Sequence, residues 1–137
     1  AKYYTVNLNN LADSLQDIEK IDEAIELQKE ALEINKELYK VNPLKWSENY
    51  TTSLNNLAIS LKEIEKIDEA IELSQEALEI RKELYKENPL KWAEAYILSL
   101  NNLAYFLKTN EAIELSQEAL KITIELYKEN PERWTKY

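Results

Sequence analysis

The stretch Leu8-Asn9-Asn10-Leu11-Ala12 decides the fold, because the sequence contains it three times. It returns as Leu54-Asn55-Asn56-Leu57-Ala58 and again as Leu100-Asn101-Asn102-Leu103-Ala104, and each copy follows the previous one after 46 residues. Self-similarity at a fixed period of this size is the signature of a repeat architecture, in which each repeat is one supersecondary unit that buries its apolar face against its neighbours.

Each repeat is predicted to hold two helices. Asn88 is a favourable N-cap and Pro89 suits the first helical turn, so a helix is expected to run from Pro89 towards Leu107. In the middle repeat the corresponding helix is expected over Pro43 to about Glu63. The residues that fall on one face of it at 100° per residue are apolar. They are Trp46, Tyr50, Leu54, Leu57, Ala58 and Leu61.

The second helix of the middle repeat is expected from near Asp68 to about Lys86, and it has two apolar edges. One edge carries Ala70, Leu73, Ala77, Ile80 and Leu84, and the other carries Ile71, Leu78 and Tyr85. Two apolar edges require two neighbours, which are the other helix of the same hairpin and the next repeat. The predicted fold class is therefore all-α, an α-solenoid of tandem antiparallel helical hairpins.

The repeat boundaries predict a single array over residues 1–137. Its repeats cover about 1–42, 43–88 and 89–130, and a further helix starts over 131–137. The chain opens with Ala1 instead of Met, and both ends cut through a predicted helix. We therefore expect either a longer parent array, from which this piece is excised, or an engineered chain that stacks end to end. The alternative is that both ends fray and the chain does not associate.

The third repeat lacks the four residues that would form the turn between its helices. The block Glu23-Ala24-Ile25-Glu26-Leu27 recurs after 46 residues and then after only 42, and the shortened connection reads Lys108-Thr109-Asn110. Three interpretations stay open. Asn110 caps the second helix after a very tight turn; the two helices fuse into one and invite domain swapping; or the printed sequence omits four residues of a mobile turn.

The composition excludes several classes of function. The 26 acidic and 17 basic residues give a net charge of −9, which repels the phosphates of nucleic acids and anionic membranes. No apolar run approaches the roughly 20 residues that cross a bilayer. The absence of His, Cys and Gly removes the usual metal ligands, the common nucleophile and base, and phosphate-binding loops. We expect no metal, no cofactor and no catalytic residues, and the lack of Cys favours a cytoplasmic location.

The pattern Leu54-x2-Leu57-Ala58-x2-Leu61, followed by Ala70 and Ala77, resembles the tetratricopeptide repeat. The period exceeds the usual length of about 34 residues, so the chain is similar to the long-repeat type found in kinesin light chain. The resemblance covers essentially the whole chain. It implies a scaffold that is not an enzyme and that binds a protein or peptide on the concave face formed by the first helices.

The helical wheel indicates which side chains of the first helices face that groove. Asn9, Asn55 and Asn101 would form a ladder of amides, which can pair with the backbone of an extended peptide because an amide both donates and accepts. A structural role for these asparagines, as hydrogen bonds across a helix pair, is the competing interpretation. The predicted peptide-binding residues are Asn9, Asp13, Thr52, Asn55, Ile59, Lys62, Leu98, Asn101, Tyr105 and Lys108.

The second helices carry a stripe of carboxylates on the side opposite to their apolar edges. We expect these carboxylates to be solvated on the convex surface and to have no chemical role. They are Glu26, Glu30, Glu33, Glu37, Glu72, Glu76, Glu79 and Glu83.

The sequence analysis leaves two candidate functions open. The first is a protein- or peptide-binding scaffold that uses the asparagine-lined groove. The alternative is an engineered or excised structural module whose main contacts are with copies of itself, as a homo-oligomer formed by end-to-end stacking or by domain swapping.

Overall fold

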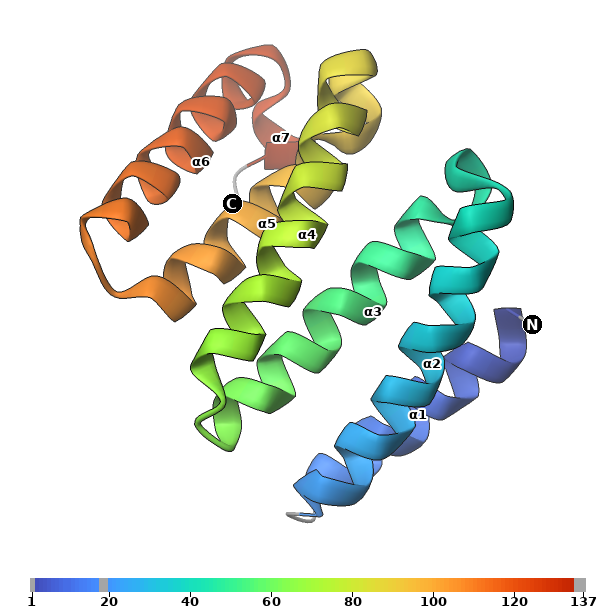
Figure 1. The fold of residues 1–137 in the computed structure, drawn as a ribbon. Helices are drawn as coiled ribbons and strands as arrows, with labels where there is room; N and C mark the ends of the chain where they lie inside the picture. The colour runs from blue at the N-terminus through green and yellow to red at the C-terminus, as the bar shows by residue number, and fades with distance from the viewer. Residues whose placement is uncertain (1, 18–19, 135–137) are drawn as a thin grey trace. The chain divides into compact units, whose positions relative to one another are not determined.

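In a computed structural model, which describes residues 2–17 and 20–134, the described residues form helices joined by short connections (Figure 1). The predicted all-α solenoid of helical hairpins is confirmed. The helices of the described residues are α1 (Lys2–Asp17), α2 (Ile21–Val41), α3 (Pro43–Glu63), α4 (Ile67–Glu87), α5 (Pro89–Leu107), α6 (Asn110–Glu129) and α7 (Pro131–Trp134).

The chain divides into two compact units, residues 1–77 and 78–137, with the division inside α4. In the first unit α1 packs against α2, and α2 packs against α3. In the second unit α5 packs against α6, which also contacts α7. The pairs α1–α2 and α5–α6 thus form the hairpin contacts that the repeat pattern predicts.

The helix starts follow from local chemistry. The side chains of Asn42 and Asn88 accept hydrogen bonds from the backbone N–H of Lys45 and Lys91, both at 3.3 Å, and a proline follows each cap. A cap of this kind satisfies one of the N–H groups that a helix leaves unpaired at its start. The predicted bounds of α3 and α5 are confirmed, and their starts follow from these signals, because the cap and the proline are adjacent to each start.

The sequence contains no glycine, and two of the described residues adopt the left-handed conformation in the connections between helices. Glu65, between α3 and α4, has φ 61°, and Lys108, after α5, has φ 48°. Such a conformation costs a residue with a Cβ about 1–2 kcal/mol. The turn between α1 and α2 includes Ile18 and Glu19, which lie outside the described residues.

The shortened turn of the third repeat separates two helices. Helix α5 ends at Leu107 and α6 begins at Asn110, so the two helices do not fuse. Of the three interpretations, the very tight turn agrees with the structure, but its cap residue was wrong: Thr109 is the N-cap residue, with extended φ and ψ, and Asn110 is the first helical residue. The left-handed Lys108 reverses the chain so sharply that the cap position falls one residue earlier than the repeat pattern indicates.

The core of the first unit contains the stripe predicted for α3. Leu54, Ala58 and Leu61 are at most 2% exposed, and Tyr50 and Leu57 are 4% exposed. Trp46, near the start of the helix, is half-buried. Burial of a large apolar side chain contributes about 1.5–3 kcal/mol, so this stripe supplies much of the unit's stability.

The core of the second unit lies between α5, α6 and the last part of α4. Leu78 and Tyr85 of α4 pack against a buried cluster that α5 and α6 share. The cluster consists of Ala93, Tyr96, Ile97, Leu100, Ala119, Ile122 and Leu126.

None of the helices that the structure describes has the length and apolar character needed to cross a membrane.

Candidate functional site

The predicted groove residues of the first unit lie on α1 and α3. Asp13 and Thr52 are exposed, Ile59 is 41% exposed, and Asn9 and Lys62 are half-buried. Asn55 is different, because only 6% of it is exposed. The three recurring asparagines therefore occupy different environments, since Asn101 in the second unit is exposed. Recurrence in the sequence does not impose equal burial, which depends on the neighbours of each helix.

A pocket between α1 and α3 brings two of these residues together. It has a volume of about 230 Å³, and we call it the α1–α3 pocket. Helix α2 contributes one residue to it, Asn35. The lining residues are Thr5, Val6, Asn9, Asn35, Glu48, Asn49 and Thr52, all within the first unit.

Two of the residues that line this pocket, Asn9 and Asn35, have a side-chain acceptor without a donor. The Oδ1 atoms of Asn9 and Asn35 are buried and have no hydrogen-bond partner among the described residues. An acceptor that is removed from water and left unpaired costs about 1–3 kcal/mol. The Oδ1 atom of Asn55, outside the pocket, is in the same condition. The pocket is therefore chemically incomplete, and a ligand that carries N–H groups would supply what it lacks.

The orientation of the Asn35 amide is fixed by its neighbours on α3. Its Nδ2 donates to Ser53 Oγ at 2.7 Å and to the backbone oxygen of Asn49 at 3.4 Å. A backbone oxygen only accepts, so the nitrogen of the amide must be the atom that faces Asn49. The oxygen of the amide consequently points away from these two groups.

Sequence reasoning missed Asn35, although a signal for it existed. The residues at the same repeat position are Arg81 and Thr123, while the residues around them are nearly constant between repeats. A polar position that varies within an otherwise copied apolar edge indicates a local function. Arg81 makes the matching contacts in the second unit, because its Nη1 donates to Ser99 Oγ at 3.0 Å and to the backbone oxygen of Ala95 at 3.2 Å.

The predicted groove residues of the second unit all lie on α5 or directly after it. Leu98 is 43% exposed and Tyr105 is 61% exposed, and Asn101 is exposed. Lys108 is the left-handed residue that follows the last turn of α5. The alignment of Asn101 with the asparagines of the first unit stays a prediction.

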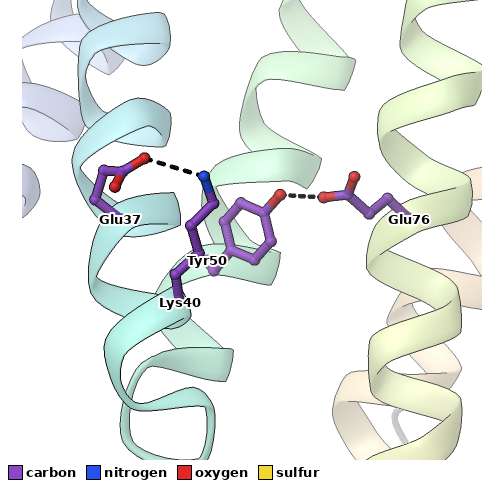
Figure 2. A network of polar contacts seen from close by, with 4 residues as sticks. All are labelled: Glu37, Lys40, Tyr50 and Glu76. Carbon is purple, nitrogen blue, oxygen red and sulfur yellow. Dashed lines mark hydrogen bonds and ion pairs between the residues drawn. The ribbon is translucent and has the colours of Figure 1, made fainter.

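Part of the carboxylate stripe has a structural role that the sequence analysis did not assign. Each stripe residue is exposed, as expected. However, Glu30 accepts a hydrogen bond from the Tyr4 hydroxyl at 2.7 Å, and Glu76 accepts one from the Tyr50 hydroxyl (Figure 2). The recurrence of tyrosine and glutamate at the same repeat positions was the signal that would have revealed these pairs.

The buried tyrosines resist ionisation. Burial raises the pKa of Tyr50 far above its usual value of 10, and the hydrogen bond to Glu76 raises it further. Burial and then the hydrogen bond to Glu118 raise the pKa of Tyr96 in the same way. These hydroxyls are fixed as hydrogen-bond donors, and no group positioned for acid–base chemistry results from them.

Lys40 and Glu37, which also appear in Figure 2, form an exposed ion pair at 3.3 Å. Lys86 and Glu83 form the equivalent pair at 3.2 Å. Exposed pairs of this spacing contribute roughly 0.3–0.5 kcal/mol, so they adjust helix stability and do not form a site.

Comparison with known families agrees with this fold. Residues 4–83 match a family model described as tetratricopeptide repeat. No match to the chain was found among curated proteins. The match covers more than half of the 137 residues and coincides with the helical hairpins of the first two repeats. The chain therefore belongs to the tetratricopeptide repeat family.

Proposed function

We propose that this chain is a protein- or peptide-binding scaffold, and that its ligand lies along the first helices of the repeats. Repeats of this family generally mediate contacts between proteins. The period of 46 residues further supports the long-repeat type, similar to that of kinesin light chain. The proposed contact residues are Asn9, Asp13, Thr52, Asn55, Ile59, Lys62, Leu98, Asn101, Tyr105 and Lys108.

The observation that carries the proposal is the unsatisfied amide chemistry of the α1–α3 pocket. Asn9 and Asn35 each bury an oxygen that has no donor among the described residues. A folded chain tolerates such groups at a cost, and buried polar groups without partners concentrate where a ligand or water completes them. The backbone N–H groups of an extended peptide are donors of the required kind.

Exposed apolar residues on the same helices support a protein ligand. Ile59 on α3 and Leu98 and Tyr105 on α5 are between 41% and 61% exposed. Binding energy at protein interfaces concentrates in a few apolar and aromatic side chains that become desolvated, with polar contacts around them. Amide groups and apolar anchors on one set of helices fit this pattern.

Selection of extended peptides from a displayed library on the intact chain tests the proposal. Binding of the selected peptides is then compared for the wild type and for the double variant Asn9→Ala and Asn101→Ala. The matched control is Glu33→Ala, an exposed change on α2. We expect at least tenfold weaker binding in the double variant and unchanged binding in the control, on the scale of one or two lost hydrogen bonds at about 1 kcal/mol each. Equal binding in all three proteins would refute the proposal that the peptide binds in the asparagine-lined groove.

Self-association is a second candidate function, because the helices α1 and α6 expose residues whose repeat equivalents are covered. Leu11 on α1 is 51% exposed, while its equivalents Leu57 and Leu103 are each 4% exposed. Leu120 on α6 is 58% exposed, while its equivalent Leu78 packs against the core of the second unit.

The occupant that fits both faces is a second copy of this chain. Helix α6 of one copy would pack against α1 of another in the manner in which α2 packs against α3 within the first unit. Thr123 would then face Asn7, at the positions that Asn35 and Ser53 occupy in that contact. This contact joins two different surfaces, so further copies can add to it and form a ring or an open row.

Light scattering over a series of concentrations separates this candidate from a monomeric scaffold. We expect the average mass of the wild type to rise with concentration beyond that of a dimer, and the rise to disappear in Leu120→Lys. Glu114→Lys, an exposed change on the same helix, is the control that should keep the association. A monomer mass at every concentration would eliminate this candidate and leave the scaffold proposal intact.

A further inference from the structure

Two residues that line the α1–α3 pocket have an acceptor without a donor. The side-chain oxygens of Asn9 and Asn35 are buried and have no hydrogen-bond partner among the described residues, and the exposed residue Glu48 lines the same pocket. Asn35 is 2% exposed, and both hydrogens of its amide nitrogen have acceptors on α3. Asn35 and Glu48 therefore leave an acceptor and a negative charge to a ligand, and this pair favours a cationic donor of several hydrogen bonds.

The next repeat shows which cation fits this position. Arg81 stands 46 residues after Asn35, and its guanidinium is buried, with only 6% of the residue exposed. It donates to the backbone oxygen of Ala95 and to Ser99 Oγ. These two acceptors are the repeat equivalents of Asn49 and Ser53. The fold thus accommodates a guanidinium beside these groups when its own sequence provides one.

In the first repeat the shorter side chain of Asn35 donates to the two acceptors that correspond to those of Arg81. Its amide nitrogen donates to the backbone oxygen of Asn49 and to Ser53 Oγ, and Asn35 itself lines the pocket of about 230 Å³. The arginine that the second repeat holds internally is absent here, whereas the surroundings that receive it are retained. The net charge of −9 favours a basic partner at longer range as well.

We propose that the α1–α3 pocket binds an arginine side chain of an extended segment of a partner protein. The guanidinium carries five N–H groups in a planar fork, which matches the two amide oxygens and the Glu48 carboxylate better than the compact ammonium of lysine. Asp13 lies one helical turn after Asn9 and is exposed, so it is placed to meet a second basic residue of the same segment. This inference rests on the scaffold function and specifies its ligand.

The test uses acetyl-arginine methylamide as the probe and follows the side-chain amide signals of asparagine by NMR in the intact chain. We expect saturable shifts at Asn9 and Asn35 with the arginine probe, and at least fivefold weaker binding of acetyl-lysine methylamide. Glu48→Gln should weaken the arginine probe about two- to fivefold, as expected for an exposed charge pair. Glu94→Gln, at the equivalent position of α5, should leave the binding unchanged.

A variant that fills the pocket makes the test decisive. In Asn35→Arg the chain supplies its own guanidinium, as Arg81 does in the second repeat, and the shifts at Asn9 should disappear while the helical circular dichroism is retained. Shifts that persist in Asn35→Arg, equal binding of the lysine probe, or no shift with the arginine probe would each overturn the inference. Display selection that yields peptides without arginine, which still depend on Asn9 and Asn101, would overturn it and leave the scaffold function standing.

Discussion

Tyr96 donates its phenolic hydrogen to Glu118 Oε1 at 2.9 Å, which joins α5 to α6 across the third hairpin. The same pairing joins Tyr4 to Glu30 in the first repeat. Each hairpin is therefore fixed by one hydrogen bond from the first helix to a carboxylate on the second, because Tyr50 and Glu76 form the pair of the middle repeat. The rings of Tyr85 and Tyr96 also approach to 5.0 Å, so the same tyrosine contacts the end of the preceding repeat.

Removal of one of these hydroxyls should destabilise the chain measurably. We expect Tyr96→Phe to lower the free energy of unfolding by about 1 kcal/mol, because a hydrogen bond to a charged acceptor is lost while the ring is kept. Tyr3→Phe is the matched control, since Tyr3 is 80% exposed. Urea unfolding followed by circular dichroism measures both. Equal midpoints for the two variants would show that the pair contributes nothing.

The buried tyrosines should also determine stability at alkaline pH. The pKa values of Tyr50 and Tyr96 in the folded chain lie above the value of about 10 in the unfolded chain. Above pH 10 the unfolded state therefore loses protons that the folded state keeps, and the free energy of unfolding falls. Below pH 10 the contribution is complete. A titration of tyrosinate absorbance should show these residues ionising only as the helices unfold, and ionisation of all tyrosines together near pH 10 would contradict this.

The left-handed residues predict stabilising substitutions. Glu65→Gly should raise the free energy of unfolding by about 0.5–1 kcal/mol, because glycine removes the steric cost at φ 61° but loses more entropy on folding. Glu79→Gly, at an exposed position inside α4, should instead lower it by about 1 kcal/mol. Thermal unfolding of the two variants beside the wild type measures the difference, and a Glu65→Gly protein that melts earlier would disprove the strain.

The buried and exposed faces of α3 provide a test of its packing. Leu54 is 1% exposed, so Leu54→Ala should cost about 2–5 kcal/mol through lost burial and the cavity that remains. Ile59 lies on the same helix and is 41% exposed, so Ile59→Ala should cost less than about 1 kcal/mol. The two urea midpoints should therefore differ strongly. Similar midpoints would mean that the helix does not bury the predicted face.

The sequence predictions were accurate where neighbouring residues determine the structure, and inaccurate where contacts between helices determine it. The start of α5 was predicted to the residue, because Asn88 and Pro89 determine it by themselves. The cap of α6 was misplaced by one residue, because the left-handed Lys108 has no signature in a chain without glycine. The variable polar position of Asn35 was visible in the sequence, but its place in the pocket was not, since that depends on which helix of the next repeat lies against it.

The helical wheel predicted the environment of the groove residues only in part, for a similar reason. The helical wheel placed Asn9 and Thr52 on the first helices, and the structure brings both to one pocket. It did not distinguish Asn55, which is 6% exposed, from Asn101, which is exposed. A wheel describes one helix, whereas burial is a property of the helix together with its neighbours.

The most direct test of the scaffold account is to map a display-selected extended peptide on the intact chain by NMR. The account predicts that the largest shifts gather on the first helices of the repeats, at residues such as Asn9, Thr52 and Asn101. It is contradicted if the shifts gather instead on the exposed face of α6 around Leu120, or on the carboxylate stripe of α2 and α4.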